Sequence, residues 1–154
     1  MAWDTKLKRA RAKLDARLAT LKPIDRFQVP AKGWIRALRD SLGLSSAQLG
    51  KTLGVRAQSI DDMEKSEANG TIRIETLRRV AKELNCTLVY ALVPNTSLDE
   101  IVNLRAHVIA ARAMANVEHT MTLEDQSVSP DNRAEIIEDY IRDYISERQL
   151  WSDA

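Results

Sequence analysis

Residues 56–62 combine an arginine, a glutamine and two aspartates with an isoleucine at helical spacing. On a helix through these residues, positions 56, 57, 58, 61 and 62 face outward. Glutamine can make two hydrogen bonds to adenine, arginine can bond guanine or a phosphate, and a carboxylate can accept from the N4 amine of cytosine. The stretch therefore predicts side chains that read DNA bases: Arg56, Ala57, Gln58, Asp61 and Asp62.

A second group of polar residues precedes this stretch and suits contacts to the DNA backbone. Hydroxyl, amide and cationic side chains make most protein contacts to phosphate oxygens. Asp61 and Asp62 oppose such binding because each carboxylate repels phosphates, so the detailed contacts in the groove stay open. The predicted phosphate contacts are Arg36, Arg39, Ser46, Gln48 and Lys51.

Two short crossed helices must position these side chains. The apolar residues Leu49, Leu53, Val55, Ile60 and Met63 are spaced to bury one face of such a pair. Gly54 permits a sharp turn between the helices, and Gly50 is small where they would touch. The outward face of the second helix is then free to enter a major groove. A helical hairpin with no role in DNA binding is the alternative.

The surrounding segments predict a mainly α fold. An apolar stripe over residues 3–21 predicts a basic first helix, and helices follow at about 32–42, from Ser45 or Ser46, at about 56–65, and around residues 77–84. Trp34 is expected in the core. We predict an N-terminal helix and connector over residues 1–30, then a helix-turn-helix domain over residues 31–86.

Residues 87–94 change the pattern from helical to β-branched and aromatic, and Pro94 ends the run. This composition predicts a short strand. A single strand cannot form a sheet, so it needs a partner elsewhere in the chain or in a second copy. We predict a homodimer with contacts from Leu88, Val89, Tyr90 and Leu92.

The C-terminal part, residues 97–154, is predicted to be helical and acidic. Ser97–Glu100 forms a capping box that opens a helix to about His119, and a last helix carries an apolar stripe over residues 137–145. Residues 1–39 have a net charge of +8, whereas residues 120–154 have a net charge of −6. Oppositely charged ends favour different partners, and we predict that the acidic end binds a protein.

Composition excludes several classes of protein. The 154 residues contain no apolar run near the ~20 that span a bilayer, and the basic N-terminus lacks the apolar stretch of a signal peptide. One cysteine, Cys86, cannot form an internal disulfide and fits a reducing cytoplasm. No ligand set frames His107 or His119, and no catalytic motif is found. We predict a cytoplasmic protein with no catalytic residues, cofactor, metal or membrane partner.

The stretch from Leu44 to Glu64 resembles the Cro/repressor-type (Xre) helix-turn-helix pattern, including its Leu-Gly-Val turn. This resemblance implies a lambda-repressor-like five-helix fold for residues 31–86. A wider set of segments resembles the family called mobile mystery protein A over nearly the whole chain. These segments are Lys32–Arg39, Ser66–Ile72, Thr76–Arg79, Leu88–Pro94 and His119–Gln126.

That resemblance implies an Xre-type protein encoded on mobile elements beside mobile mystery protein B, a Fic-domain protein. Fic domains commonly transfer AMP to hydroxyl groups of their targets. A DNA-binding neighbour of such an enzyme is implied to be its antitoxin and the repressor of its operon.

The same resemblance directs attention to Thr120 and Glu124. Fic inhibition, in families that have it, uses a short helix with Ser or Thr, three further residues, Glu, and then Gly or Asn. The glutamate occupies an arginine that would otherwise hold the γ-phosphate of ATP. Thr120–Glu124 matches the first five places and Asp125 departs at the sixth. The alternative is an ordinary solvated or turn-capping glutamate, since Thr-x-x-x-Glu is a common spacing.

We therefore predict a sequence-specific repressor of double-stranded DNA that also acts as antitoxin of an adjacent Fic-domain toxin. One alternative is an interaction protein that inhibits the Fic partner without binding DNA. The other is a free-standing dimeric Xre-type transcription regulator. The gene beside this one would separate the first and the last of these hypotheses.

Overall fold

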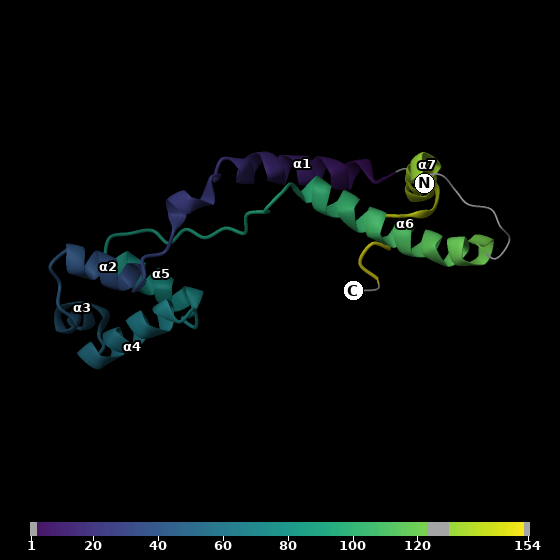
Figure 1. Ribbon diagram of the computed structural model, residues 1–154. Helices are drawn as coiled ribbons and strands as arrows, with labels where there is room; N and C mark the ends of the chain where they lie inside the picture. The colour runs from purple at the N-terminus through teal and green to yellow at the C-terminus, as the bar shows by residue number, and fades with distance from the viewer. Residues whose placement is uncertain (1–2, 123–129, 153–154) are drawn as a thin grey trace. The chain divides into compact units, whose positions relative to one another are not determined.

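The computed structural model describes residues 3–122 and 130–152 of the chain, and this part is mainly helical, as the sequence predicts (Figure 1). Two compact units are present. We call Pro23–Leu92 the central unit, and Met1–Lys22 with Val93–Ala154 the terminal unit. The helices are α1 (Thr5–Ala19), a 3-10 turn η1 (Ile24–Phe27), α2 (Trp34–Ser41), α3 (Ser46–Leu53), α4 (Ala57–Ala68), α5 (Ile74–Glu83), α6 (Leu98–Thr122) and α7 (Pro130–Tyr144).

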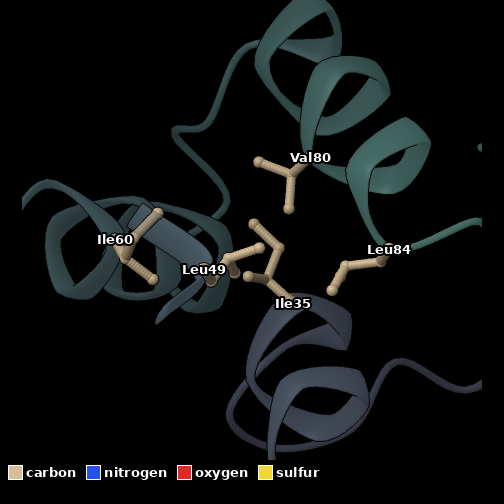
Figure 2. Close-up of a cluster of buried hydrophobic side chains, with 5 residues drawn as sticks. All are labelled: Ile35, Leu49, Ile60, Val80 and Leu84. Carbon is tan, nitrogen blue, oxygen red and sulfur yellow. The ribbon is translucent and has the colours of Figure 1, made fainter. Parts of the chain in front are cut away.

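The central unit folds around an apolar cluster to which every one of its α-helices contributes. Ile35 comes from α2, Leu49 from α3, Ile60 from α4 and Val80 from α5, and Leu84 follows the end of α5. Figure 2 shows these five side chains pointing toward one another. Helices of 8 to 12 residues are marginal alone, so this shared core stabilises all of them together.

Two expectations for the central unit need correction, and a third is not confirmed. Residues 31–86 contain four α-helices rather than five, because α2 to α5 and the turns between them already occupy this range. Trp34 is 45% exposed rather than buried, since Ile35 faces the core in its place. No strand occurs in the described residues, so the strand predicted over residues 87–94 is not confirmed: within one chain this segment has no partner to pair with.

The terminal unit brings the two ends of the chain together. Ala106 and Ala110 of α6 are fully buried against Ile141 of α7 and the segment that follows it, and Trp3 packs against the same cluster. Small residues on α6 allow α7 to approach closely. By contrast, α1 has no buried residue. None of the described helices is both long and apolar enough to cross a membrane.

Polar contacts hold α1 in the terminal unit. Arg11 donates to Asp99 at the start of α6 and makes two hydrogen bonds of 3.0 and 3.1 Å to Glu147, which is buried. Asp15 accepts from the backbone N–H of Leu98, and Ser97 accepts from that of Glu100 as the predicted N-cap. Two side chains of α1 thus fix which of its faces lies against the unit.

Candidate nucleic-acid interface

The turn between α3 and α4 has the geometry that the two glycines require. Gly54 has φ +70°, a left-handed conformation that side chains with a Cβ rarely adopt, and it ends α3. A Cβ on Gly50 would lie only 2.7 Å from the carbonyl oxygen of Val55. The Val55 N–H also donates to the Gly50 carbonyl at 2.8 Å. The backbone of α3 therefore touches the turn directly, and this contact sets where α4 begins.

The inner face of α4 is attached to α2 by a buried ion pair. The Arg39 guanidinium donates to Glu64 at 2.6 and 3.3 Å and to the carbonyl of Leu44 at 2.8 Å. Both side chains are about one-tenth exposed or less. The hydrogen bonds to Glu64 raise the pKa of Arg39 above its usual value, although burial opposes this. The ion pair ties the two helices together.

One turn further along α4, Glu67 caps the start of α2. Its carboxylate accepts from the backbone N–H groups of Trp34 at 2.8 Å and Ile35 at 2.9 Å. These N–H groups have no partner within their own helix, and a negative charge also complements the helix dipole. Glu64 and Glu67 thus fix α4 on α2 at two successive turns, which leaves the opposite face of α4 for a ligand.

The exposed face at the start of α4 carries Arg56, Gln58 and Asp62, all at the surface. Gln58 donates its side-chain amide to Asp62 at 3.0 Å, one turn along. Ala57 is half-buried beside them. This face has the side-chain types for base recognition. The Gln58–Asp62 hydrogen bond holds the amide at the surface, where an incoming base edge can replace the carboxylate as its partner.

Asp61 lies in a different environment from Asp62. It is half-buried and accepts from the hydroxyl of Ser46 on α3 at 2.7 Å. This contact joins the first turns of the two helices and directs the Asp61 carboxylate toward α3. The repulsion that two outward carboxylates would exert on phosphates is therefore smaller than the sequence alone indicates.

The predicted phosphate contacts fall into three groups. Lys51 is exposed, and Arg36 is exposed with Asp40 at 3.7 Å. Gln48 is exposed, but its side-chain oxygen accepts from the backbone N–H of Ser45 in a capping box at the start of α3. Arg39 has its guanidinium engaged inside the unit, so it belongs to the framework and we leave it out of the proposed interface.

The sequence did not reveal that Arg39, Glu64 and Glu67 attach α4 to α2. The glutamate at position 64 belongs to the resembling pattern, but its partner lies 25 residues earlier and no local signal identifies it. Glu67 binds the backbone of Ile35 and Trp34, which precede it by 32 and 33 positions in the sequence. The spacing of apolar residues does place both glutamates near the inner side of α4, which is the one available signal.

Other predicted sites lie apart from this face. Leu88 is half-buried, whereas Val89, Tyr90 and Leu92 are strongly exposed. Thr120 belongs to α6, and Glu124 lies outside the described residues. His107 contacts the Asn103 carbonyl and Glu138. Over residues 3–122 and 130–152, no three His, Cys, Asp or Glu side chains gather in a way that would hold a metal.

Comparison with known proteins supports the reading of the central unit. Residues 35–90 match the family model HTH_3, described as helix-turn-helix. No curated protein and no solved structure matches the chain. The chain therefore contains an Xre-like helix-turn-helix domain, of the kind found in DNA-binding transcription regulators, and α3 and α4 are its two crossed helices.

Proposed function

We propose that this protein is a sequence-specific transcriptional repressor that reads DNA with the first two turns of α4. The observation that carries the proposal is the division of α4 into two faces. Glu64 and Glu67 hold one face on α2, and the other presents Arg56 and Gln58 to solvent. A helix held in this way within a helix-turn-helix domain suits the major groove.

In this proposal each side chain has a defined part. Gln58 exchanges its hydrogen bond to Asp62 for the edge of an adenine, and Arg56 binds a guanine or a phosphate. Lys51, Arg36 and Gln48 lie along the DNA backbone and set the position of the helix without carrying sequence information. The hydroxyl of Ser46 donates to Asp61, so Ser46 joins Arg39 in the framework. Ala57 offers a small apolar surface next to Gln58 and suits a thymine methyl group.

The test begins by selecting a bound sequence from a random duplex library with the unaltered protein. Arg56→Ala and Gln58→Ala are then measured on the selected site and on single-base variants of it. Each substitution should reduce discrimination at one base pair by about 1–3 kcal/mol, which is roughly five- to 150-fold. Asn69→Ala at the far end of α4 and Lys82→Ala on α5 are matched controls, and both residues are exposed. Unchanged base preference in both test variants would contradict the proposal.

We also propose that the protein binds DNA as a homodimer that pairs through residues 87–93. Val89 is 78% and Leu92 91% exposed, which is high for apolar side chains in a chain acting alone. Pairing with a second copy would cover them and give the segment the strand partner that it lacks. Two recognition helices would then reach half-sites about 34 Å apart.

Val89→Pro removes a backbone donor from such a pairing and should shift the protein toward monomer in sedimentation velocity. Its affinity for a two-half-site duplex should fall, whereas helix content should stay unchanged. A native protein that is monomeric at all concentrations would rule out the dimer while leaving base recognition by α4 intact.

A second candidate function is that of an antitoxin for an adjacent Fic-domain protein. The resemblance to mobile mystery protein A supports it, together with the match of Thr120–Glu124 to the inhibitory pattern. If this is correct, co-expression with the neighbouring Fic protein should suppress AMP transfer, and Glu124→Gly should release it without changing DNA binding. If Glu124→Gly still silences the partner fully, Glu124 is not the inhibitory residue and restraint comes from another surface or from repression.

A further inference from the structure

The outer face of α1 carries a stripe of four cationic side chains that take no part in the contacts described above. Lys6, Arg9, Lys13 and Arg17 are all exposed. They follow one another at intervals of three, four and four residues, so they lie on one face of the helix. We call this set the α1 stripe.

The contacts of α1 determine that this face points away from the terminal unit. Arg11 and Asp15 bind inward, to Glu147 and to the start of α6. Lys13 is two residues from both of them, and Arg9 and Arg17 lie two residues beyond. Two residues along an α-helix turn a side chain by about 200°. The α1 stripe is therefore on the opposite side of the helix from the side chains that anchor it.

Nothing within the described part of the chain neutralises these cations. None of the four has a carboxylate within ion-pair distance there, whereas Arg11 has two. The two nearest carboxylates in the sequence, on Asp4 before α1 and Asp15 within it, both accept backbone hydrogen bonds. Asp4 caps α1 by accepting from the backbone N–H of Lys6, and Asp15 caps α6.

The spacing also opposes the stability of α1. Arg9, Lys13 and Arg17 are successive i,i+4 neighbours, and like charges at this spacing destabilise a helix. The chain shows the opposite pattern on α7, where Arg142 bonds both Asp139 and Asp143. A helix that keeps four unneutralised cations in register, against its own stability, suits binding to an extended polyanion.

We infer that the α1 stripe binds the phosphate backbone of DNA beside the site that α4 reads. This inference rests on the proposed function of the helix-turn-helix domain. Duplex DNA carries one charge per about 1.7 Å of its axis, and the stripe extends over about 16 Å, so it faces several phosphates at once. Because the two units share one chain, the second contact is intramolecular and adds to affinity without adding sequence information.

The composition of this face favours DNA over an anionic membrane. A helix that enters a membrane surface presents large apolar side chains beside its cations. The residues interspersed with the α1 stripe are Ala10, Ala16 and Thr20, which are too small for that purpose. The three leucines of α1 lie outside the stripe: Leu18 is half-buried, and Leu7 and Leu14 are 40% and 46% exposed.

The test replaces all four stripe residues by glutamine in the full-length protein. Glutamine is a good helix former, so α1 should persist, and circular dichroism verifies this. Lys8→Gln with Arg112→Gln is the control, because Lys8 lies on α1 outside the stripe and Arg112 is exposed on α6. Binding is measured by fluorescence anisotropy on a mixed-sequence duplex of about three helical turns, from about 50 to 200 mM salt, and on phosphatidylglycerol vesicles.

The stripe variant should bind the duplex roughly tenfold or more weakly near 0.15 M salt. Its log–log salt dependence should become shallower by about 0.9 for each lost phosphate contact, up to about 3.6 in total. The control should change the slope by much less per charge removed. The loss should be equal on the selected site and on mixed sequence, so that base preference is retained.

An unchanged salt slope on DNA overturns the inference, and so does a loss confined to vesicle binding. The two proposals fail in different ways. Gln58→Ala removes no charge and tests sequence preference at an intact salt slope, whereas the stripe variant tests the slope at an intact sequence preference.

Discussion

Each unit of this protein contains an arginine–glutamate pair whose glutamate is buried, and the two pairs have different structural roles. In the central unit Arg39 and Glu64 join α2 to α4 beside an apolar cluster to which all four helices contribute. In the terminal unit Arg11 and Glu147 join α1 to the chain after α7, and α1 has no buried residue of its own. The first pair joins helices that share an apolar core, whereas the second holds a helix that contributes no buried residue to the core of its unit.

This difference indicates what each unit loses when its arginine is removed. An uncompensated glutamate inside the central unit has no route to water unless the unit opens, because Glu64 lies among packed helices. In the terminal unit, undocking of α1 is enough to hydrate Glu147. We therefore expect global unfolding in one case and local detachment in the other.

Replacing Arg39 by methionine should have the largest effect. Removal of one partner of a buried ion pair costs about 3–5 kcal/mol, which is a large fraction of the stability of a small domain. Urea unfolding followed by circular dichroism measures the loss, and DNA binding should fall with it. Arg36→Met is the control for the urea measurement alone, because Arg36 is exposed on the same helix and should change stability little.

The double variant Arg39→Met with Glu64→Leu sharpens this prediction. Apolar residues of similar size often replace a buried pair without loss, so the double variant should be more stable than Arg39→Met alone. If the losses of stability from Arg39→Met and Glu64→Leu simply add up in the double variant, the unpaired charge of Glu64 is not the cause of the instability. The ion pair would then contribute mainly through packing.

Replacing Arg11 by methionine should have a smaller and local effect of about 1–3 kcal/mol on the terminal unit. Hydrogen exchange should become faster in α1 while the amides of α3 and α4 keep their protection. Lys8→Met serves as the control on an exposed position of the same helix. Parallel loss of protection in the central unit would show that the two units do not fold independently, and the comparison above would then be wrong.

The contrast between an apolar core and a helix held by polar contacts also explains how much of the fold could be predicted from the sequence. In the central unit Leu49 and Ile60 recur at helical spacing around a turn glycine, and both occupy the core as predicted. These signals are local, since each helix must bury one face whatever else it contacts. Trp34 was misplaced because neighbouring residues on a helix face different directions, and Ile35 rather than Trp34 faces inward.

Contacts between distant residues were not predictable in this way. Arg11 and Glu147 are 136 residues apart, and nothing near either of them identifies the other. The assembly of one unit from both ends of the chain depends on such contacts. At the candidate interface the outward side chains of α4 could be predicted from helical geometry, but the bond between Ser46 and Asp61 and the engagement of Arg39 could not.

The smallest predicted effect is a pH dependence of stability that the terminal unit should show and the central unit should not. Both histidines of the chain belong to the terminal unit, and the central unit has none. The Nδ1 atom of His107 lies 2.8 Å from the Asn103 carbonyl, and Nε2 lies 2.8 Å from a carboxylate oxygen of Glu138 on α7. A neutral imidazole has only one N–H, so only the protonated ring can donate to both acceptors. These contacts raise the pKa of His107, and the Asn103 carbonyl is the largest cause.

The sign of the pH effect follows from that raised pKa. The stabilisation is fully present below the unfolded value of about 6.5 and is lost as the pH rises through the higher folded value. Because His107 and Glu138 are both exposed, we expect at most a few tenths of a kcal/mol between α6 and α7. His107→Gln should remove this pH dependence from the unfolding of the terminal unit. The central unit should show no matching change across the same pH range, and a histidine-like titration of its stability would contradict the independence of the two units.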